Sequence, residues 1–272
     1  MTSDKHVAET ADATDASAVT ALRSGAVAVV TMRTPALTAA AKQQLLTALD
    51  ELSADGSIRA VVLTGAGRVF CAGQDLGEHA AALERDPEHA FDTVERDYNP
   101  IVTSLVTAPK PVIAAINGTC AGAGLSLALA CDLRVCADSA KFTTAFTGIG
   151  LSCDSGLSAT LAQAVGLARA SELVLRAEPF TAERALSWGL VGEVVAADEL
   201  ADAARALAER LAAGPTLAHA TAKAALRRAW GLPLPEVLAA EGRDQHRLGL
   251  TVDHRNATAA FLAKQRPQFH GR

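Results

Sequence analysis

The sequence predicts an α/β fold with a C-terminal part that is entirely helical. Short apolar segments, such as 59–64 and 111–117, have the length and β-branched content of buried strands, and amphipathic helical segments alternate with them. This alternation is typical of an α/β core. After residue 199 the strand pattern stops and only helical segments follow. Half of the 272 residues are hydrophobic, so the chain can form a sizeable core.

The elements are predicted in order from periodicity and from capping residues. Segment 25–32 alternates like a strand, and four leucines lie along one side of a helix over 39–52. Thr181 is the expected N-cap, and Gly189 the stop, of a helix over 181–188. The other predicted strands are 59–64, 111–117, 133–137 and 190–195, and the other helices are 124–130, 155–165, 168–175, 200–213, 215–230, 235–248 and 253–265, with mixed helix and loop over 77–99 and a loop over 142–154.

The chain is predicted to have three regions. Residues 1–20 are rich in Ala, Thr and Asp, without the cationic start or hydrophobic centre of a targeting peptide, so a mobile tail is expected. Residues 21–197 form the α/β core. Residues 198–272 form a helical region whose apolar stripes are expected to pack on neighbouring subunits.

Composition argues against several function classes. The net charge of −5 and the isoelectric point near 5.8 do not fit a nucleic-acid-binding or anionic-membrane surface. No apolar stretch reaches the length of a membrane span. The seven histidines show no ligand-like pairing, so no metal site is predicted. The five cysteines are odd in number and lack CxxC spacing, which indicates buried, reduced thiols and a cytoplasmic protein.

Two segments combine a strand with a turn of small residues. Strand 60–64 leads to the turn Phe-Cys-Ala-Gly-Gln-Asp-Leu at 70–76, and strand 111–117 leads to Thr-Cys-Ala-Gly-Ala-Gly at 119–124. Small side chains leave backbone N–H groups open to a cavity. Two such turns that direct N–H groups at one point would form an oxyanion hole. Alternatively, the glycines serve only tight packing; they do not have dinucleotide-binding spacing.

Several of these segments resemble the crotonase, or enoyl-CoA hydratase/isomerase, superfamily. The resemblance rests on TGAGRVFCAGQDL (64–76), Tyr-Asn-Pro (98–100), KPVIAAINGTCAGAG (110–124), SAKF (139–142), Ala-Phe (145–146), GIGLSCDSG (148–156) and FLAKQRPQF (261–269). It implies a crotonase-like ββα spiral core, a C-terminal helical trimerisation region, and a homotrimer or a dimer of trimers. It also implies an acyl-CoA thioester substrate and no separate cofactor, because CoA arrives as part of the substrate.

The resemblance also implies which residues form the site. The N–H groups of Gln74 and Ala123 would hold the thioester oxygen. Asp75 has an alternative role in holding the turn through backbone hydrogen bonds. Lys264 would reach the CoA phosphates, or would simply be a solvated surface lysine. The residues implied to bind substrate are Ala72, Gly73, Asp75, Leu76, Ala121, Gly122, Phe146, Leu151 and Lys264.

The candidate catalytic acid separates two chemistries. Hydratases of the superfamily carry two glutamates, but their positions correspond here to Ser126 and Phe146, which cannot activate water or donate a proton in that way. Asp154 matches the aspartate of the isomerase type. One carboxylate suffices to remove a proton from one carbon and return it to another. Position alone also allows Asp154 to cap the helix over 155–165.

Two rival functions remain open at the level of sequence. Enoyl-CoA hydration would need an unrecognised second acid such as Glu78 or Glu84. A non-catalytic acyl-CoA-binding protein would explain the missing glutamates. It would also fit segment 33–37. The superfamily counterpart of this segment helps to bind CoA through its backbone, and the segment here is shorter and lacks the counterpart's Asn.

Overall fold

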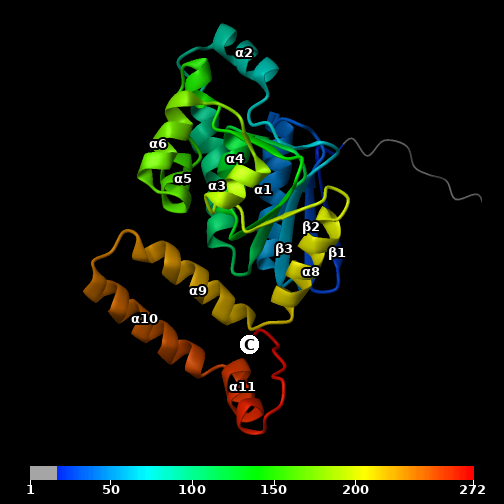
Figure 1. Ribbon diagram of the computed structural model, residues 1–272, viewed down its shortest axis with the longest axis vertical. Coiled ribbons are helices and arrows are strands. Elements are labelled where there is room, and N and C mark those ends of the chain that lie inside the picture. The colour runs from blue at the N-terminus through cyan, green and yellow to red at the C-terminus, as the bar shows by residue number, and fades with distance from the viewer. Residues whose placement is uncertain (1–16) are drawn as a thin grey trace, which may run out of the picture.

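Two β-sheets form the centre of the molecule in a computed structural model, which describes residues 17–272 (Figure 1). The larger sheet has the order β1-β2-β3-β5-β7-β10 and is parallel except for the antiparallel β1–β2 pair. Its strands are β1 (Val19–Ser24), β2 (Val27–Met32), β3 (Ala60–Gly65), β5 (Val112–Ile116), β7 (Leu133–Ala137) and β10 (Glu193–Val195). The smaller sheet has the order β4-β6-β8-β9, from β4 (Val69–Cys71), β6 (Thr119–Ala121), β8 (Lys141–Thr143) and β9 (Phe180–Thr181).

From β3 to β8, successive strands alternate between the two sheets, and helices follow the pairs. Strand β3 is followed by β4, β5 by β6, and β7 by β8. The helices are α1 (Ala39–Ala54), α2 (Leu76–Arg85), α3 (Asn99–Thr107), α4 (Ala123–Ala130), α5 (Leu157–Val165), α6 (Leu167–Arg176), α7 (Ala182–Ser187), α8 (Leu200–Ala212), α9 (Thr216–Ala229), α10 (Leu234–Gly249) and α11 (Val252–Leu262), with a π-helical turn η1 (Val94–Tyr98) and a 3₁₀ turn η2 (Phe146–Ile149). The predicted α/β class and ββα arrangement are confirmed.

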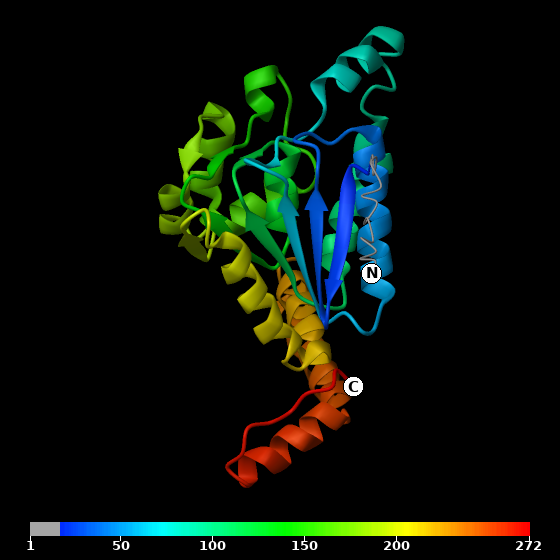
Figure 2. The same cartoon turned by 90° about the vertical axis from the view of Figure 1, so that its right-hand side faces the viewer.

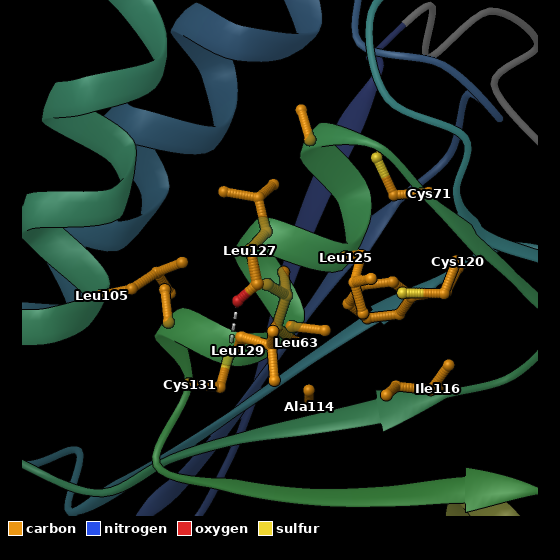
Figure 3. Packing of buried hydrophobic residues seen from close by; sticks show 14 of the residues in the cluster. Leu63, Cys71, Leu105, Ala114, Ile116, Cys120, Leu125, Leu127, Leu129 and Cys131 are labelled. Carbon is orange, nitrogen blue, oxygen red and sulfur yellow. Dashed lines mark hydrogen bonds between the residues drawn. The ribbon is translucent and has the colours of Figure 1, made fainter. Parts of the chain in front are cut away.

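Both faces of the larger sheet are covered, which explains the continuous apolar runs of its strands. Alternate residues face opposite sides: Val61 and Leu63 belong to the core cluster that includes α1, α3 and α4, whereas Ala60 and Val62 pack with α8. Figure 2 shows α8 and α1 on opposite faces of the sheet. Helix α4 is buried along its whole length between the two sheets, where Leu125, Leu127 and Leu129 pack with strand residues (Figure 3).

Some elements differ from the sequence-based predictions. Strand β1 begins at Val19, inside the predicted tail 1–20; residues 1–16 of that tail lie outside the described residues. The four strands of the smaller sheet have two or three residues each, too few for a period to be recognised. Helix α3 was missed because Tyr98 and Asn99 continue directly from η1 without a capping residue. The Thr181 cap of α7 is confirmed, since its hydroxyl accepts from the Arg184 amide.

The C-terminal helices extend away from this core (Figure 2). Helix α9 is held to it by Asp132, whose carboxylate pairs with Lys223 at 2.7 Å and with Arg227 at 3.1 Å. Among residues 17–272, no helix combines the length and the hydropathy needed to cross a membrane.

Candidate active site

A cavity of about 170 Å³ lies where the two small-residue turns meet. Most of its wall is apolar. Glycine and alanine residues of the two turns form one side, and side chains from α2, η1 and η2 form the other. Its lining residues are Ala72, Gly73, Gln74, Leu76, His79, Phe91, Thr93, Val94, Tyr98, Gly122, Ala123, Ala145, Phe146, Ile149, Leu151 and Asp154.

The first turn leaves the amide of Gln74 available to this cavity. The Gly73 carbonyl accepts a hydrogen bond of 2.7 Å from the Leu37 amide. Because the C=O and N–H of a trans peptide point in opposite directions, the Gln74 N–H points away from Leu37. Among residues 17–272 this N–H donates to no protein atom. The same segment is further held by the Ala72 amide, which donates to Pro35.

The second turn presents the amide of Ala123 in the same way. Ala123 is the first residue of α4, and the preceding carbonyl of Gly122 accepts from the amides of Leu125 and Ser126 inside the helix. The Ala123 N–H therefore points out of the helix N-terminus, where the helix dipole adds positive potential. It too has no protein acceptor within residues 17–272.

Glycines allow the two turns to approach each other closely. Gly73 has φ +90°, and a Cβ added there would lie 3.3 Å from the Ala123 nitrogen. At Gly124 an added Cβ would lie 2.1 Å from the Cys71 carbonyl oxygen. Any larger residue at Gly124 would therefore push α4 away from β4. The turns thus bring the Gln74 and Ala123 amides, both without a protein acceptor among residues 17–272, to the same cavity. An oxyanion hole requires such a pair of N–H donors.

Asp154 is the one carboxylate that lines the cavity among residues 17–272. Burial raises its pKa above the usual value, and a hydrogen bond of 2.8 Å from the Ser155 hydroxyl opposes this rise. Asp154 does not cap α5, because the N-cap is Gly156 and no side-chain cap bond forms there among the described residues. The capping alternative is therefore wrong, and the carboxylate is available to a molecule in the cavity.

Neither hydratase position carries an acid or a base here. Ser126 is fully buried, and its hydroxyl donates to the carbonyls of Gly122 and Asp154, both at 3.4 Å. Phe146 lies in the cavity wall. Glu78 and Glu84 are absent from the lining, and Glu78 instead accepts from the Ala39 amide at 2.7 Å.

The structure brings most of the sequence-predicted site residues together, but not all of them. Asp75 caps α2 by accepting from the Glu78 amide at 2.9 Å, so its role is the turn-holding alternative. Ala121 is in β6 and does not reach the cavity. Lys264 follows α11, at the opposite end of the molecule from α2, and therefore cannot reach this chain's own cavity (Figure 1). The predicted residues that line the cavity are Ala72, Gly73, Gln74, Leu76, Gly122, Ala123, Phe146, Leu151 and Asp154.

Three polar side chains beside the first turn, those of Lys42, Thr93 and Tyr98, were not predicted from the sequence. Tyr98 and Thr93 line the cavity, and Lys42 donates to Gln74 and to Thr93. A signal was present: Lys42 lies on the same helix side as Leu45 and Leu49, and a lysine on an apolar stripe requires a buried partner.

Comparison with known proteins gives the family. Residues 23–272 match the family model for enoyl-CoA hydratase/isomerase. The chain is 44% identical over 230 residues to 1,2-epoxyphenylacetyl-CoA isomerase of Escherichia coli, covering 84% of this chain and 87% of that one. It is 43% identical over 249 residues to a probable enoyl-CoA hydratase of Rhodobacter capsulatus, covering 90% and 95%. An enoyl-CoA hydratase structure from Polaromonas sp. JS666 superposes with a TM-score of 0.88 at 35% identity, covering 93% and 99%.

The chain belongs to the enoyl-CoA hydratase/isomerase family, and it is an acyl-CoA enzyme of that family. Relatives named as isomerase and as hydratase are equally similar, so their names do not distinguish the two reactions.

Proposed function

We propose that this protein isomerises the acyl group of a CoA thioester by moving a proton between two carbons. Asp154 removes a proton from the carbon beside the thioester carbonyl. The electrons of that C–H bond delocalise onto the carbonyl oxygen, which the Gln74 and Ala123 N–H groups hold as an enolate oxyanion. Asp154, now protonated, returns the proton to another carbon of the conjugated system, and the thioester carbonyl re-forms.

The observation that carries this proposal is the composition of the cavity. The Gln74 and Ala123 amides, which have no protein acceptor among residues 17–272, share it with the carboxylate of Asp154. Burial raises the pKa of Asp154, which makes its carboxylate a stronger base and its acid form a usable donor for the return step.

The same cavity gives less support to hydration. Adding water needs one group to activate the water and another to protonate carbon. Ser126 and Phe146 supply neither, and the carboxylate of Glu78 is engaged by the start of α1. A non-catalytic binding protein is also less supported, because such a protein would have no need to keep an ionisable carboxylate in an apolar wall at a desolvation cost.

The cavity favours an acyl group that is compact and apolar, and we propose one that contains a ring. Its volume of about 170 Å³ is close to the ~150 Å³ of an apolar cavity that binds benzene. Leu76, Phe91, Val94, Ile149 and Leu151 supply apolar wall. The similarity to an epoxyphenylacetyl-CoA isomerase supports the same substrate class.

We further propose that the enzyme needs no separate cofactor and works as a homotrimer or a dimer of trimers in the cytoplasm. CoA is part of the substrate, and the reaction moves only a proton. The five cysteines are free thiols, four of them buried, which fits a reducing compartment.

The test is hydrogen exchange at carbon. Wild-type protein incubated with arylacetyl-CoA or 3-enoyl-CoA in D₂O is expected to incorporate deuterium beside the carbonyl, measured by mass spectrometry. Asp154→Asn is expected to slow exchange by about 10²–10⁴-fold while still binding thioester. The exposed Asp138→Asn serves as the matched control. Exchange at the wild-type rate in Asp154→Asn would show that another group moves the proton.

A further inference from the structure

A buried polar network lies directly behind the first oxyanion turn. Lys42 of α1 is 3% exposed, and its Nζ donates to Gln74 Oε1 at 3.3 Å and to Thr93 Oγ1 at 2.5 Å. The Tyr98 hydroxyl, from η1, donates to the same Gln74 oxygen. Lys42 also lies 4.9 Å above the Tyr98 ring. The Gln74 side chain is therefore fixed by two donors on one atom.

The charge of Lys42 is balanced locally. Its Nζ lies 3.8 Å from Asp97 Oδ2, and the same oxygen accepts from Thr93 at 2.7 Å. Burial lowers the pKa of Lys42, and the charge of Asp97 opposes that shift. Burial raises the pKa of Tyr98, so its hydroxyl stays protonated and donates. Well-packed apolar residues commonly replace a buried ionic group without loss of stability. The presence of the Lys42–Asp97 pair therefore indicates a role beyond folding.

The network acts on the residue that supplies the first oxyanion donor. On one side of Gln74 the Gly73 carbonyl accepts from Leu37, and on the other side the Asp75 amide donates to the Leu37 carbonyl at 3.3 Å. These bonds fix the two flanking peptides, and Lys42 and Tyr98 fix the side chain. All three directions from the Gln74 Cα are thus constrained, which leaves its N–H little freedom to turn away from the cavity.

We propose that Lys42 and Tyr98 are positioning residues that hold the Gln74 side chain so that its backbone N–H is preset for the thioester oxyanion. The proposal rests on the proposed function, in which this N–H is an oxyanion donor. A π-helical turn carries Tyr98, and such turns are frequent at functional sites. Preset dipoles stabilise developing charge without reorganising during the reaction, and this is their advantage over mobile donors.

Three variants test the proposal: Gln74→Ala, which keeps the backbone N–H, Tyr98→Phe and Lys42→Met. Each is expected to lower the maximal rate of deuterium exchange about 10- to 100-fold, because the donor remains but is misplaced. The thioester concentration at half-maximal rate is expected to stay within about twofold, since ground-state binding uses other contacts. The exposed Gln43→Ala and Lys141→Met are the matched controls.

A second readout does not depend on turnover. The infrared C=O stretch of bound acyl-CoA, labelled with ¹³C at the thioester carbonyl, reports how strongly the N–H groups polarise that bond. Its shift on binding is expected to be smaller in each variant than in the wild type. If wild-type protein polarises the carbonyl but exchanges no hydrogen, the proposed isomerisation fails, and the infrared comparison still decides the positioning role.

A double-mutant cycle separates positioning from direct contact. If Tyr98 acts through Gln74, adding Tyr98→Phe to Gln74→Ala causes no further loss. A full additional loss would mean that Tyr98 touches substrate itself. Unchanged deuterium exchange rates and an unchanged C=O stretch in the single variants would mean that the network is only structural. Either result overturns the proposal. If Lys42→Met does not fold, as circular dichroism would show, the other two variants decide the outcome.

Discussion

Asp154 shows how the enclosure of one residue sets its chemistry. An exposed aspartate is a weak base at neutral pH. Burial among the apolar cavity residues raises the pKa of Asp154, and the Ser155 hydroxyl counteracts this by stabilising the charged form. Ser155 itself is held at φ +53°, a conformation that few non-glycine residues adopt. The residue whose hydroxyl lowers the pKa of Asp154 therefore has a strained backbone conformation.

The pH dependence of activity tests this balance. Proton removal needs the Asp154 carboxylate, so the rate falls as pH decreases through the pKa of this group. Ser155→Ala removes the donor that lowers this pKa, and the acid limb of the pH–rate profile is therefore expected to move to higher pH. Ser155→Gly, which has no strain at positive φ, is expected to shift it in the same direction.

The measurement is the deuterium exchange rate between about pH 4 and pH 9, a range that spans the usual carboxyl and imidazole pKa values. Ser158→Ala, at an exposed position on α5, is the control. An unchanged acid limb in both Ser155 variants would show that a different group limits the rate.

At the scale of elements, the sequence predicted what lies within one local segment. Strands β3 and β5 and helix α4 each have a continuous pattern, and all three were predicted. The network around Gln74 was not predicted, because its members lie far apart in the chain. Gln74 is 32 residues from Lys42 and 24 from Tyr98, so only the packing of α1 and η1 against the first turn brings them together.

The direction of the two N–H groups was likewise not visible in the sequence. This direction depends on the hydrogen bonds made by the neighbouring carbonyls. Leu37 sets the direction at Gln74, and it belongs to segment 33–37, which lacks the superfamily Asn. Backbone atoms of Pro35 and Leu37 make the required bonds, and backbone atoms leave no residue signature.

The close approach of α4 to β4 makes a second prediction. Gly124→Ala places a Cβ 2.1 Å from the Cys71 carbonyl, so α4 must shift. The expected cost is about 1–3 kcal/mol of unfolding free energy, together with a more than tenfold loss of exchange as the Ala123 amide moves away from that of Gln74. Urea unfolding and deuterium exchange measure the two effects.

Gly242→Ala provides the contrast for that experiment. Gly242 lies inside α10, and apart from its chain neighbours and its own helix backbone no described atom lies within 4 Å of an added Cβ, so alanine is expected to stabilise the protein by about 1 kcal/mol. A Gly124→Ala protein with wild-type stability and exchange would mean that the two turns do not need this close approach.

At the scale of the whole molecule, the C-terminal helices carry apolar surface that the chain itself does not cover. Helices α9, α10 and α11 lie outside the core, joined to it by the Lys223–Asp132–Arg227 ion pairs (Figure 2). The end of the chain folds back beside α11, where Asp253 accepts from the amides of His270 and Gly271. The large apolar residues exposed on these helices and the segments joining them are Leu226, Trp230, Leu234, Leu238, Leu250, Phe261 and Leu262.

Exposed apolar side chains in this number are typical of a surface that another subunit covers. The homotrimer or dimer of trimers proposed above would cover this surface, and sedimentation velocity distinguishes the two. Leu238 is 58% exposed, so Leu238→Glu leaves the fold of one chain unchanged but is expected to place a charge in the interface and dissociate it. Leu22→Glu, on the edge strand β1 with Leu22 70% exposed, is the matched control and is expected to keep the wild-type assembly. A wild-type protein that sediments as a monomer, or a Leu238→Glu protein that assembles like wild type, would mean that this surface serves something other than self-association.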